Sequence, residues 1–233
     1  MAPKARLAFR NCATNVRLFT YIMSTDKGFA PNPFWGYCTL ATCKPTIRRT
    51  AQRGDWVAGF RRDPDSRELR LVHAMEVTEA PMPFQQYDTD RRFLRKRPVW
   101  KSRAVERCGD NIYFLLSNGG FGQRQSFHNS THMERDLRGR FVLVSRNFYY
   151  FGSAARAVPS SIRGVQPKGQ GHRSRFDPKV IRRFVSWVQH SFRPGRLGSP
   201  SDGPLSKVTC DCHPAKARRF GGFLHFPSEH SRV

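Results

Sequence analysis

Acidic residues are scarce in this sequence. It contains 17 Asp and Glu against 41 Lys and Arg, which gives a formal net charge of +24 at pH 7. Such a charge destabilises a compact chain by self-repulsion, which an anionic partner relieves. Nucleic acid is the first candidate and an anionic membrane the second, with a merely solvated basic surface as the alternative. Aromatic residues interleaved with arginines favour nucleic acid, because rings stack on bases while guanidinium groups contact phosphates.

Long apolar runs are also missing. None reaches the ~18 residues that a membrane span needs, and the opening residues, MAPKARLAFRNCATNVRLF, lack the apolar core of a secretory signal. Six cysteines in 233 residues are too few for a disulfide scaffold. We therefore expect reduced thiols in a cytoplasmic protein without a membrane partner. Because 38% of the residues are apolar and 12% aromatic, a folded core is expected.

Familiar catalytic and metal-binding motifs are absent as well. The sequence has no P-loop, GxGxxG, GxSxG or spaced Cys–His nucleophile signature. Cys38 and Cys43 have no second Cys or His pair nearby, and the C-x-C spacing of Cys210 and Cys212 is tight for tetrahedral ligation. We expect free thiols at both places, no bound metal and no cofactor.

Short apolar runs predict five or six strands with a few helices between them. Strands are expected at 17–23, 55–60, 69–80, 111–116, 141–145 and 148–151, and helices at 45–53, at 84–94 and from Asp177-Pro178 onward. In the strand 69–80, a period of two puts Leu69, His73 and Val77 on one side facing a core, which makes His73 a packed core histidine.

The spacing of these elements predicts the fold and its limits. Strands that follow each other this closely do not fit alternating βαβ units. We expect an α+β fold, a small and partly open β-barrel with flanking helices. The predicted organisation is a basic tail at 1–16, one domain at 17–190 and an irregular tail at 191–233, where Pro, Gly and Ser are frequent.

One segment resembles a known family. It is TDKGFAPNPFWGYCTLATCKPTIRRTAQRGDWVAG at 25–59, and it is joined by HAMEVTE at 73–79, GDNIY at 109–113 and LVSRNFYYFG at 143–152. These stretches resemble the second type of nucleotide-modification-associated domain, which is found with DNA base-modification genes in phages and bacteria. The resemblance covers roughly residues 17–190. The order of a short helix, GDWV and a strand ending in EVTE is also similar to PUA-like and EVE domains, small barrels that seat a nucleobase.

The resemblance implies a protein that binds nucleic acid or a modified nucleotide. Its partner would be DNA with a modified or flipped base, together with other products of a base-modification gene cluster. Rings and a few fixed polar groups are what a base pocket needs, although the rings could instead be core. The nucleotide-binding candidates are Asp26, Asn32, Phe34, Trp35, Thr39, Lys44, Arg48, Arg49, His128 and Ser145.

A dense basic segment adds candidates for phosphate binding. RRFLRKRPVWKSRAVER at 91–107 has eight Lys and Arg and one Glu. Arg95, Arg97 and Lys101 are the expected phosphate contacts, and Trp100 could stack on an unpaired base. Arg48 and Arg49 could clamp a phosphate with their rigid donor forks, or they could form a solvated helix face.

Two other functions stay open. An enzyme of base hypermodification would use Asp26, His128 or Asp110 as acid or base, and a basic structural protein would have all its rings in the core. His128 and His132 could share a metal if they lay on a helix, but the Asn, Ser and Thr between them argue against one. A carboxyl with a raised pKa in a cleft would favour the enzyme.

Overall fold

A large sheet divides the molecule. The computed structural model describes residues 16–169 and 171–202. The sheet has the strand order β11-β1-β3-β4-β9-β12, with β10 paired to β4. Its strands are β1 (Leu18–Ile22), β3 (Trp56–Arg62), β4 (Leu69–Glu76), β9 (Phe148–Tyr150), β10 (Arg156–Ala157), β11 (His172–Arg173) and β12 (Gly195–Arg196). β3 and β4 form an antiparallel hairpin, whereas β1 runs parallel to β3.

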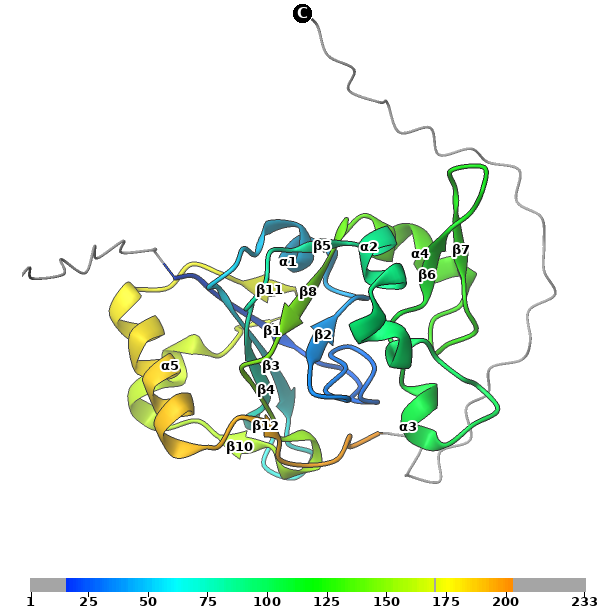
Figure 1. The fold of residues 1–233 in the computed structure, drawn as a ribbon. Coiled ribbons are helices and arrows are strands. Elements are labelled where there is room, and N and C mark those ends of the chain that lie inside the picture. The colour runs from blue at the N-terminus through cyan, green and yellow to red at the C-terminus, as the bar shows by residue number, and fades with distance from the viewer. Residues whose placement is uncertain (1–15, 170, 203–233) are drawn as a thin grey trace, which may run out of the picture.

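Two smaller sheets and most helices lie on one side of the large sheet, and α5 covers the other side (Figure 1). The small sheets are β2 (Cys38–Leu40), β8 (Phe141–Ser145) and β5 (Met82–Pro83), and β6 (Tyr113–Leu115) with β7 (Phe121–Gln123). The helices are α1 (Pro45–Thr50), α2 (Phe84–Thr89), α3 (Ala104–Arg107), α4 (Ser130–Leu137), α5 (Pro178–Ser191), and the 3-10 helices η1 (Arg91–Lys96), η2 (Gly152–Ala154) and η3 (Ser160–Val165). The α+β class is confirmed. No sheet closes into a barrel among the described residues, so the expected barrel is not confirmed.

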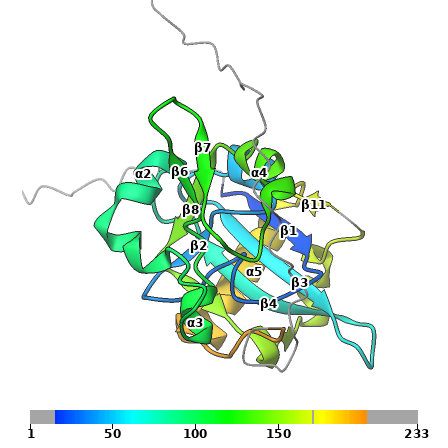
Figure 2. The same ribbon diagram turned by 90° about the vertical axis from the view of Figure 1, so that its right-hand side faces the viewer.

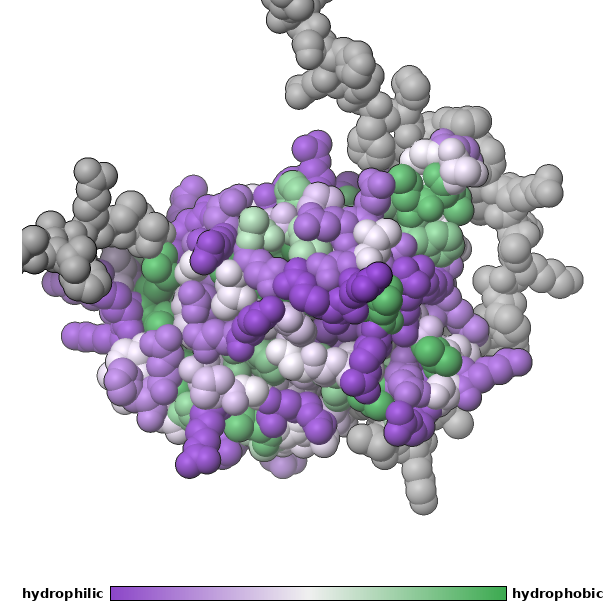
Figure 3. All heavy atoms as spheres, viewed as in Figure 1, coloured by the Kyte–Doolittle hydropathy of each residue, from purple (hydrophilic) through white to green (hydrophobic). Residues whose placement is uncertain are grey.

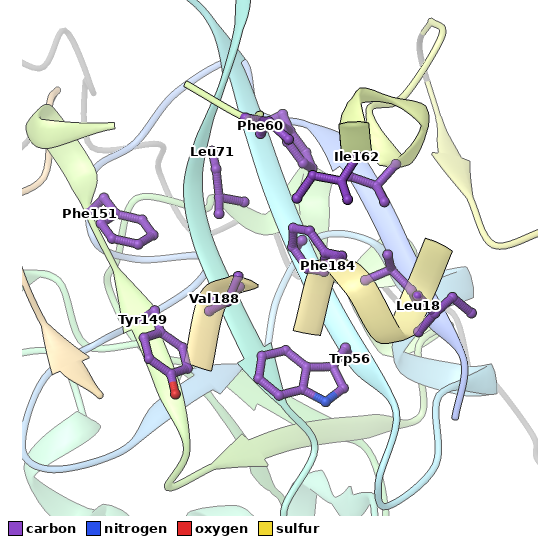
Figure 4. Close-up of a cluster of buried hydrophobic side chains, with 14 residues drawn as sticks. Leu18, Trp56, Phe60, Leu71, Tyr149, Phe151, Ile162, Phe184 and Val188 are labelled. Atoms are coloured by element: carbon purple, nitrogen blue, oxygen red, sulfur yellow. The ribbon is translucent and has the colours of Figure 1, made fainter. Parts of the chain in front are cut away.

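The predicted helix after residue 177 is confirmed as α5. The Asp177 side chain caps it by accepting a hydrogen bond from the Lys179 amide, and Pro178 occupies its first turn. Its apolar stripe includes Phe184 and Val188, which are fully buried against the large sheet (Figure 4). Each such side chain contributes about 1.5–3 kcal/mol through burial, so tertiary packing holds α5 in place.

The strand β4 departs from the predicted two-sided pattern. Both of its faces are buried: Leu71 and Ala74 pack toward α5, and Val72 and Met75 pack toward the smaller sheet. The alternation breaks where the pairing of β3 with β4 shifts register next to Gly59. A central strand that is covered on both sides needs no polar face, which explains why the single-core-face prediction was wrong.

His73 is a packed core histidine, as predicted. It is fully buried on β4, and its Nε2 lies 2.9 Å from the Tyr21 hydroxyl. Burial lowers the pKa of His73 to about 3. A Cβ at Gly59 would lie 2.5 Å from the same Nε2, so the register shift and the glycine together make room for the ring.

Two helix predictions need correction. The single helix expected at 84–94 is two helices, because Asp90 has an extended backbone between them and caps η1 through the Arg92 amide. The segment that contains His132 is helical, as α4, although its Asn, Ser and Thr were read against a helix. Asn129 caps α4 by accepting from the Thr131 amide, and residues of these types favour a helix start.

The chain beyond α5 returns to the large sheet. β12 pairs with β9 in parallel, and Ser201 donates hydrogen bonds from its amide and hydroxyl to Asp26.

Cys210 and Cys212 lie outside the described residues, whereas Cys38, Cys43 and Cys108 are free thiols. None of the described helices is long and apolar enough to cross a membrane.

Candidate functional site

A cleft of about 550 Å³ opens beside the end of β1. It is formed by β1 and the loop after it, the start of α1, the segment that leads into α4, and residues beside β11. Figure 2 shows β1, β11 and α4 on the same side of the molecule. The lining residues are Tyr21, Ile22, Met23, Ser24, Thr25, Lys27, Phe29, Ala30, Cys43, Lys44, Pro45, Thr46, Ile47, Phe127, His128, His132, Arg135, Gly171 and His172.

Aromatic rings and cations both line this cleft, with Tyr21 and Phe29 buried in its wall. The Lys44 ammonium lies 4.4 Å from the centre of the Tyr21 ring. Phe29 packs edge-on against His128, with ring centres 5.0 Å apart, and against Phe127 at 5.7 Å. Flat apolar surfaces next to positive charge suit a planar ligand that carries negative charge.

Three side chains on one wall form a hydrogen-bonded relay. His128 Nε2 lies 3.5 Å from the Cys43 Sγ, and His128 Nδ1 lies 2.5 Å from the Asp136 Oδ2. Cys43 and His128 are half-buried and line the cleft, whereas Asp136 is fully buried behind them. A thiol, an imidazole and a carboxylate in this order match a nucleophile, its base and a group that orients the base.

The position of Asp136 is fixed by several donors. Its Oδ1 accepts from the Cys43 amide at 2.8 Å, and its Oδ2 accepts from the Tyr113 hydroxyl at 2.9 Å as well as from His128. Burial raises the pKa of Asp136, but these hydrogen bonds outweigh burial and leave the pKa below its usual value. Asp136 is therefore a carboxylate at neutral pH.

The same contacts keep His128 protonated. Burial lowers the pKa of His128, but the hydrogen bonds to Asp136 and Cys43 outweigh it and raise the pKa to about 9. At neutral pH the His128 ring is therefore an imidazolium, and its Nε2 faces the Cys43 sulfur at 3.5 Å.

A buried arginine lies directly beneath the relay. Arg48 has no solvent exposure. Its guanidinium donates to the carbonyl oxygens of Cys43, Asp136 and Phe141, and a Cβ at Gly139 would lie 2.3 Å from the guanidinium carbon. Burial lowers the pKa of Arg48 to about 10, so the group is a fixed positive charge behind Cys43 and Asp136.

The relay atoms could also hold a metal ion. One ligand atom each from Cys43, His128 and Asp136 lies within 4.8 Å of the others. A metal ion would have to replace existing hydrogen bonds, so these residues fit one poorly. Both Asp136 oxygens already accept hydrogen bonds from protein groups, and His128 bridges Asp136 and Cys43. The His128–His132 pair considered in the sequence is stacked face to face, with ring centres 4.4 Å apart.

The loop residues expected to form a pocket lie elsewhere. Asp26 and Asn32 are buried. Asp26 accepts from the Tyr150 hydroxyl, and the Asn32 amide donates to the Cys108 carbonyl at 2.7 Å. Phe34 and Trp35 line a second, separate hollow, which Arg196 also borders.

Three further candidates are interior groups. Asp110 is buried and accepts from the hydroxyls of Thr39 and Tyr87, both at 2.7 Å. Burial raises the pKa of Asp110, but the group does not line the cleft beside β1. Ser145 is buried too and donates to the Asn147 carbonyl.

The candidate phosphate contacts divide by exposure. Arg49, Arg95 and Lys101 are exposed, and in the described part of the chain they form no ion pair. Arg97 is paired with Asp88 at 3.0 Å. Arg48 is interior, as described above, so the structure gives it a different place from the expected clamp.

The basic segment 91–107 adjoins the cleft. Trp100 packs edge-on against Phe127, with ring centres 5.5 Å apart. Since Phe127 lines the cleft, Trp100 connects the exposed cations of that segment to its rim.

Sequence reasoning missed the partnership of Cys43 with His128 and Asp136. It named His128 as a candidate, but the 85-residue separation of Cys43 from His128 follows no motif spacing. The usable signal was local: Cys43 directly precedes a lysine and the proline that opens α1.

Among the comparisons with known proteins, the match comes from a family model. Neither the curated proteins nor the solved structures gave a match. The model of the family described as nucleotide modification associated domain 2 matches residues 15–207. That range is most of the chain, and so the chain belongs to the nucleotide modification associated domain 2 family.

Proposed function

We propose that the protein binds one nucleotide of a DNA strand, with a modified or flipped base, in the cleft beside β1. The observation that carries this proposal is the lining of that cleft, which combines the rings of Tyr21, Phe29 and Phe127 with the cations Lys44 and Arg135. Membership of a nucleotide-modification-associated family supports a role in a base-modification system, whose other gene products would be partners.

The size and chemistry of the cleft support this ligand class. A volume of about 550 Å³ lies within the ~300–1,000 Å³ typical of small-molecule sites. Base stacking on a ring contributes ~1–3 kcal/mol per base. The ammonium of Lys44 lines the cleft and donates to the Ile22 carbonyl at 3.1 Å, and a phosphate bound there would be its second partner. The exposed cations of 91–107 would hold the flanking strand next to Trp100. As part of this proposal, the cleft would hold the base, which is the role that the likeness to PUA-like and EVE domains implies.

The first prediction tests the cleft cations. Lys44→Met and Arg135→Ala are expected to weaken binding of a labelled single-stranded 12-mer of DNA, because each removes a phosphate contact. On a log–log plot of affinity against salt, each lost contact reduces the slope by ~0.7. Fluorescence anisotropy at several salt concentrations measures both effects.

Arg183→Ala is the matched control, since Arg183 is an exposed arginine on α5. It removes the same charge as Arg135→Ala and leaves the cleft intact. If the two arginine variants weaken binding equally, bulk charge explains the affinity and the cleft is not the binding site.

A further inference from the structure

We propose that Cys43 is the nucleophile of a thiol-dependent reaction at the cleft, with His128 as its acid and base and Asp136 as a positioning residue. The substrate bond is the carbon–nitrogen bond of an amide on a modified base. The choice of substrate rests on the proposed nucleotide binding, whereas the reactivity of Cys43 depends only on the relay.

Geometry separates Cys43 from the other described cysteines. Its thiol lines the cleft and faces His128 Nε2 at 3.5 Å. Cys38 and Cys108 are buried, and burial raises the pKa of each thiol to about 12. Because the thiolate is the reactive form, the fold leaves Cys43 as the accessible nucleophile among these three.

Several positively charged groups lie around the relay. Arg48 lies beneath it, and Lys44 and Arg135 flank it in the cleft. The His132 ring stacks on the His128 ring, and the Tyr113 hydroxyl donates a hydrogen bond to Asp136. Among the described residues, the carboxylate in hydrogen-bond contact with His128 is Asp136, and its charge is paired with the imidazolium.

The reaction balances with water as the second reactant. The Cys43 sulfur forms a bond to the amide carbon, and the carbon–nitrogen bond breaks. The departing nitrogen keeps the electron pair and takes the proton from His128 Nε2. His128 then deprotonates water, whose oxygen bonds to the thioester carbon. The carbon–sulfur bond breaks, which restores the thiolate beside the imidazolium and releases a carboxylic acid.

The position of His128 Nε2, at the cleft wall and 3.5 Å from the Cys43 sulfur, suits proton delivery to the leaving nitrogen in the first half of this sequence. An amine is a poor leaving group unless it is protonated, and a base oriented by a carboxylate can return that proton. Asp136 contacts neither the thiol sulfur nor the substrate position, so its effect is exerted through His128 and through the Cys43 amide.

The test measures alkylation of the full chain by iodoacetamide, with peptide mapping by mass spectrometry to assign each cysteine. At pH 7 the parent Cys43 is expected to react about three- to tenfold faster than in His128→Gln. The reason is the position of His128 Nε2, 3.5 Å from the Cys43 sulfur, where the imidazole can exchange a proton with the thiol and a glutamine amide cannot. At pH 6 the difference is expected to grow. Asp136→Asn is expected to shift the pH profile in the same direction.

His190→Gln on α5 is the matched control and is expected to leave the profile unchanged. Comparing Cys43 with Cys108 inside the parent needs no variant, so a variant that folds poorly does not weaken the test. Equal alkylation rates at Cys43 and Cys108, or a pH profile that His128→Gln leaves unchanged, would overturn the assignment of Cys43 as the nucleophile. If Cys43 is protected from alkylation until a chelator is added, and the protein contains about one zinc per chain, the relay is a metal site instead.

The substrate bond has its own probe, N4-acetyl-2′-deoxycytidine. Acid quenching is expected to trap an acetyl group on the Cys43 peptide of the parent and none in His128→Gln, while deoxycytidine is released. Fast alkylation without this acetyl group would overturn the amide substrate. Fast alkylation of Cys43 in a parent chain that does not bind the labelled DNA would contradict the proposed nucleotide binding and leave the nucleophile standing, so the two proposals can fail separately.

Discussion

Two histidines, His73 in the core and His128 half-buried at the cleft, have pKa values displaced in opposite directions. His73 is lowered to about 3 and His128 is raised to about 9. Below pH 6.5 the unfolded chain protonates His73 whereas the folded chain does not, so stability falls as pH decreases toward 3. Above pH 6.5 the folded chain retains the His128 proton that the unfolded chain has lost, so stability falls as pH rises toward 9. Both effects favour the folded state most near pH 6.5.

A prediction follows for His128. Between pH 6.5 and 9 the parent is expected to lose up to about 1.4 kcal/mol of unfolding free energy per pH unit through this residue. His128→Gln is expected to lack that loss. Urea unfolding across this range measures the slope. A variant with the same slope as the parent would show that His128 is not the group responsible.

Single residues were predictable where their role is local. His73 was identified from the alternation of its strand, and Asp177 from its place before Pro178. Asp136 had no such local signal. Its role depends on the Cys43 amide and the Tyr113 hydroxyl, and no local pattern encodes contacts made across the whole chain.

Helices and strands were also predictable where the signal is local. β1, β3, β8, β9 and α5 were expected from runs of apolar residues. The short strands β10, β11 and β12 have two residues each and are held by their neighbours in the sheet. A two-residue strand has no periodicity to detect.

The cap of α5 gives a prediction at this scale. Asp177→Ala removes the side chain that accepts from the Lys179 amide, which is expected to cost about 1 kcal/mol of stability. Chemical unfolding measures the loss. Asp177→Asn retains an acceptor and serves as the control, so an equal loss in both variants would assign the effect to charge and not to capping.

At the scale of the whole molecule, excess positive charge remains after the internal pairs are counted. Arg92, Arg97 and Arg124 are paired with carboxylates, which uses several of the 17 acidic residues. The face in Figure 3 is mostly hydrophilic, with small separate hydrophobic areas. This surface is consistent with a polyanionic partner.

The segment after α5 supplies the last prediction. A chain that ends at residue 190 loses β12 and the hydrogen bonds from Ser201 to Asp26. Burying Asp26 without these partners is unfavourable, so the shortened chain is expected to melt several degrees below one that ends at 207. Differential scanning calorimetry compares the two. Equal melting temperatures would show that the segment contributes nothing to the fold.

Both outer strands of the large sheet come from late in the sequence, since β11 and β12 lie at residues 172–173 and 195–196. During synthesis on the ribosome, β1 and β9 therefore emerge long before the strands that pair with their outer edges. Unpaired edges attract other strands, and partly made chains with such edges aggregate. Slow translation of the part of the message that encodes residues 172–196 would prolong that exposure, so yield in cells is expected to depend on how fast this part of the gene is read.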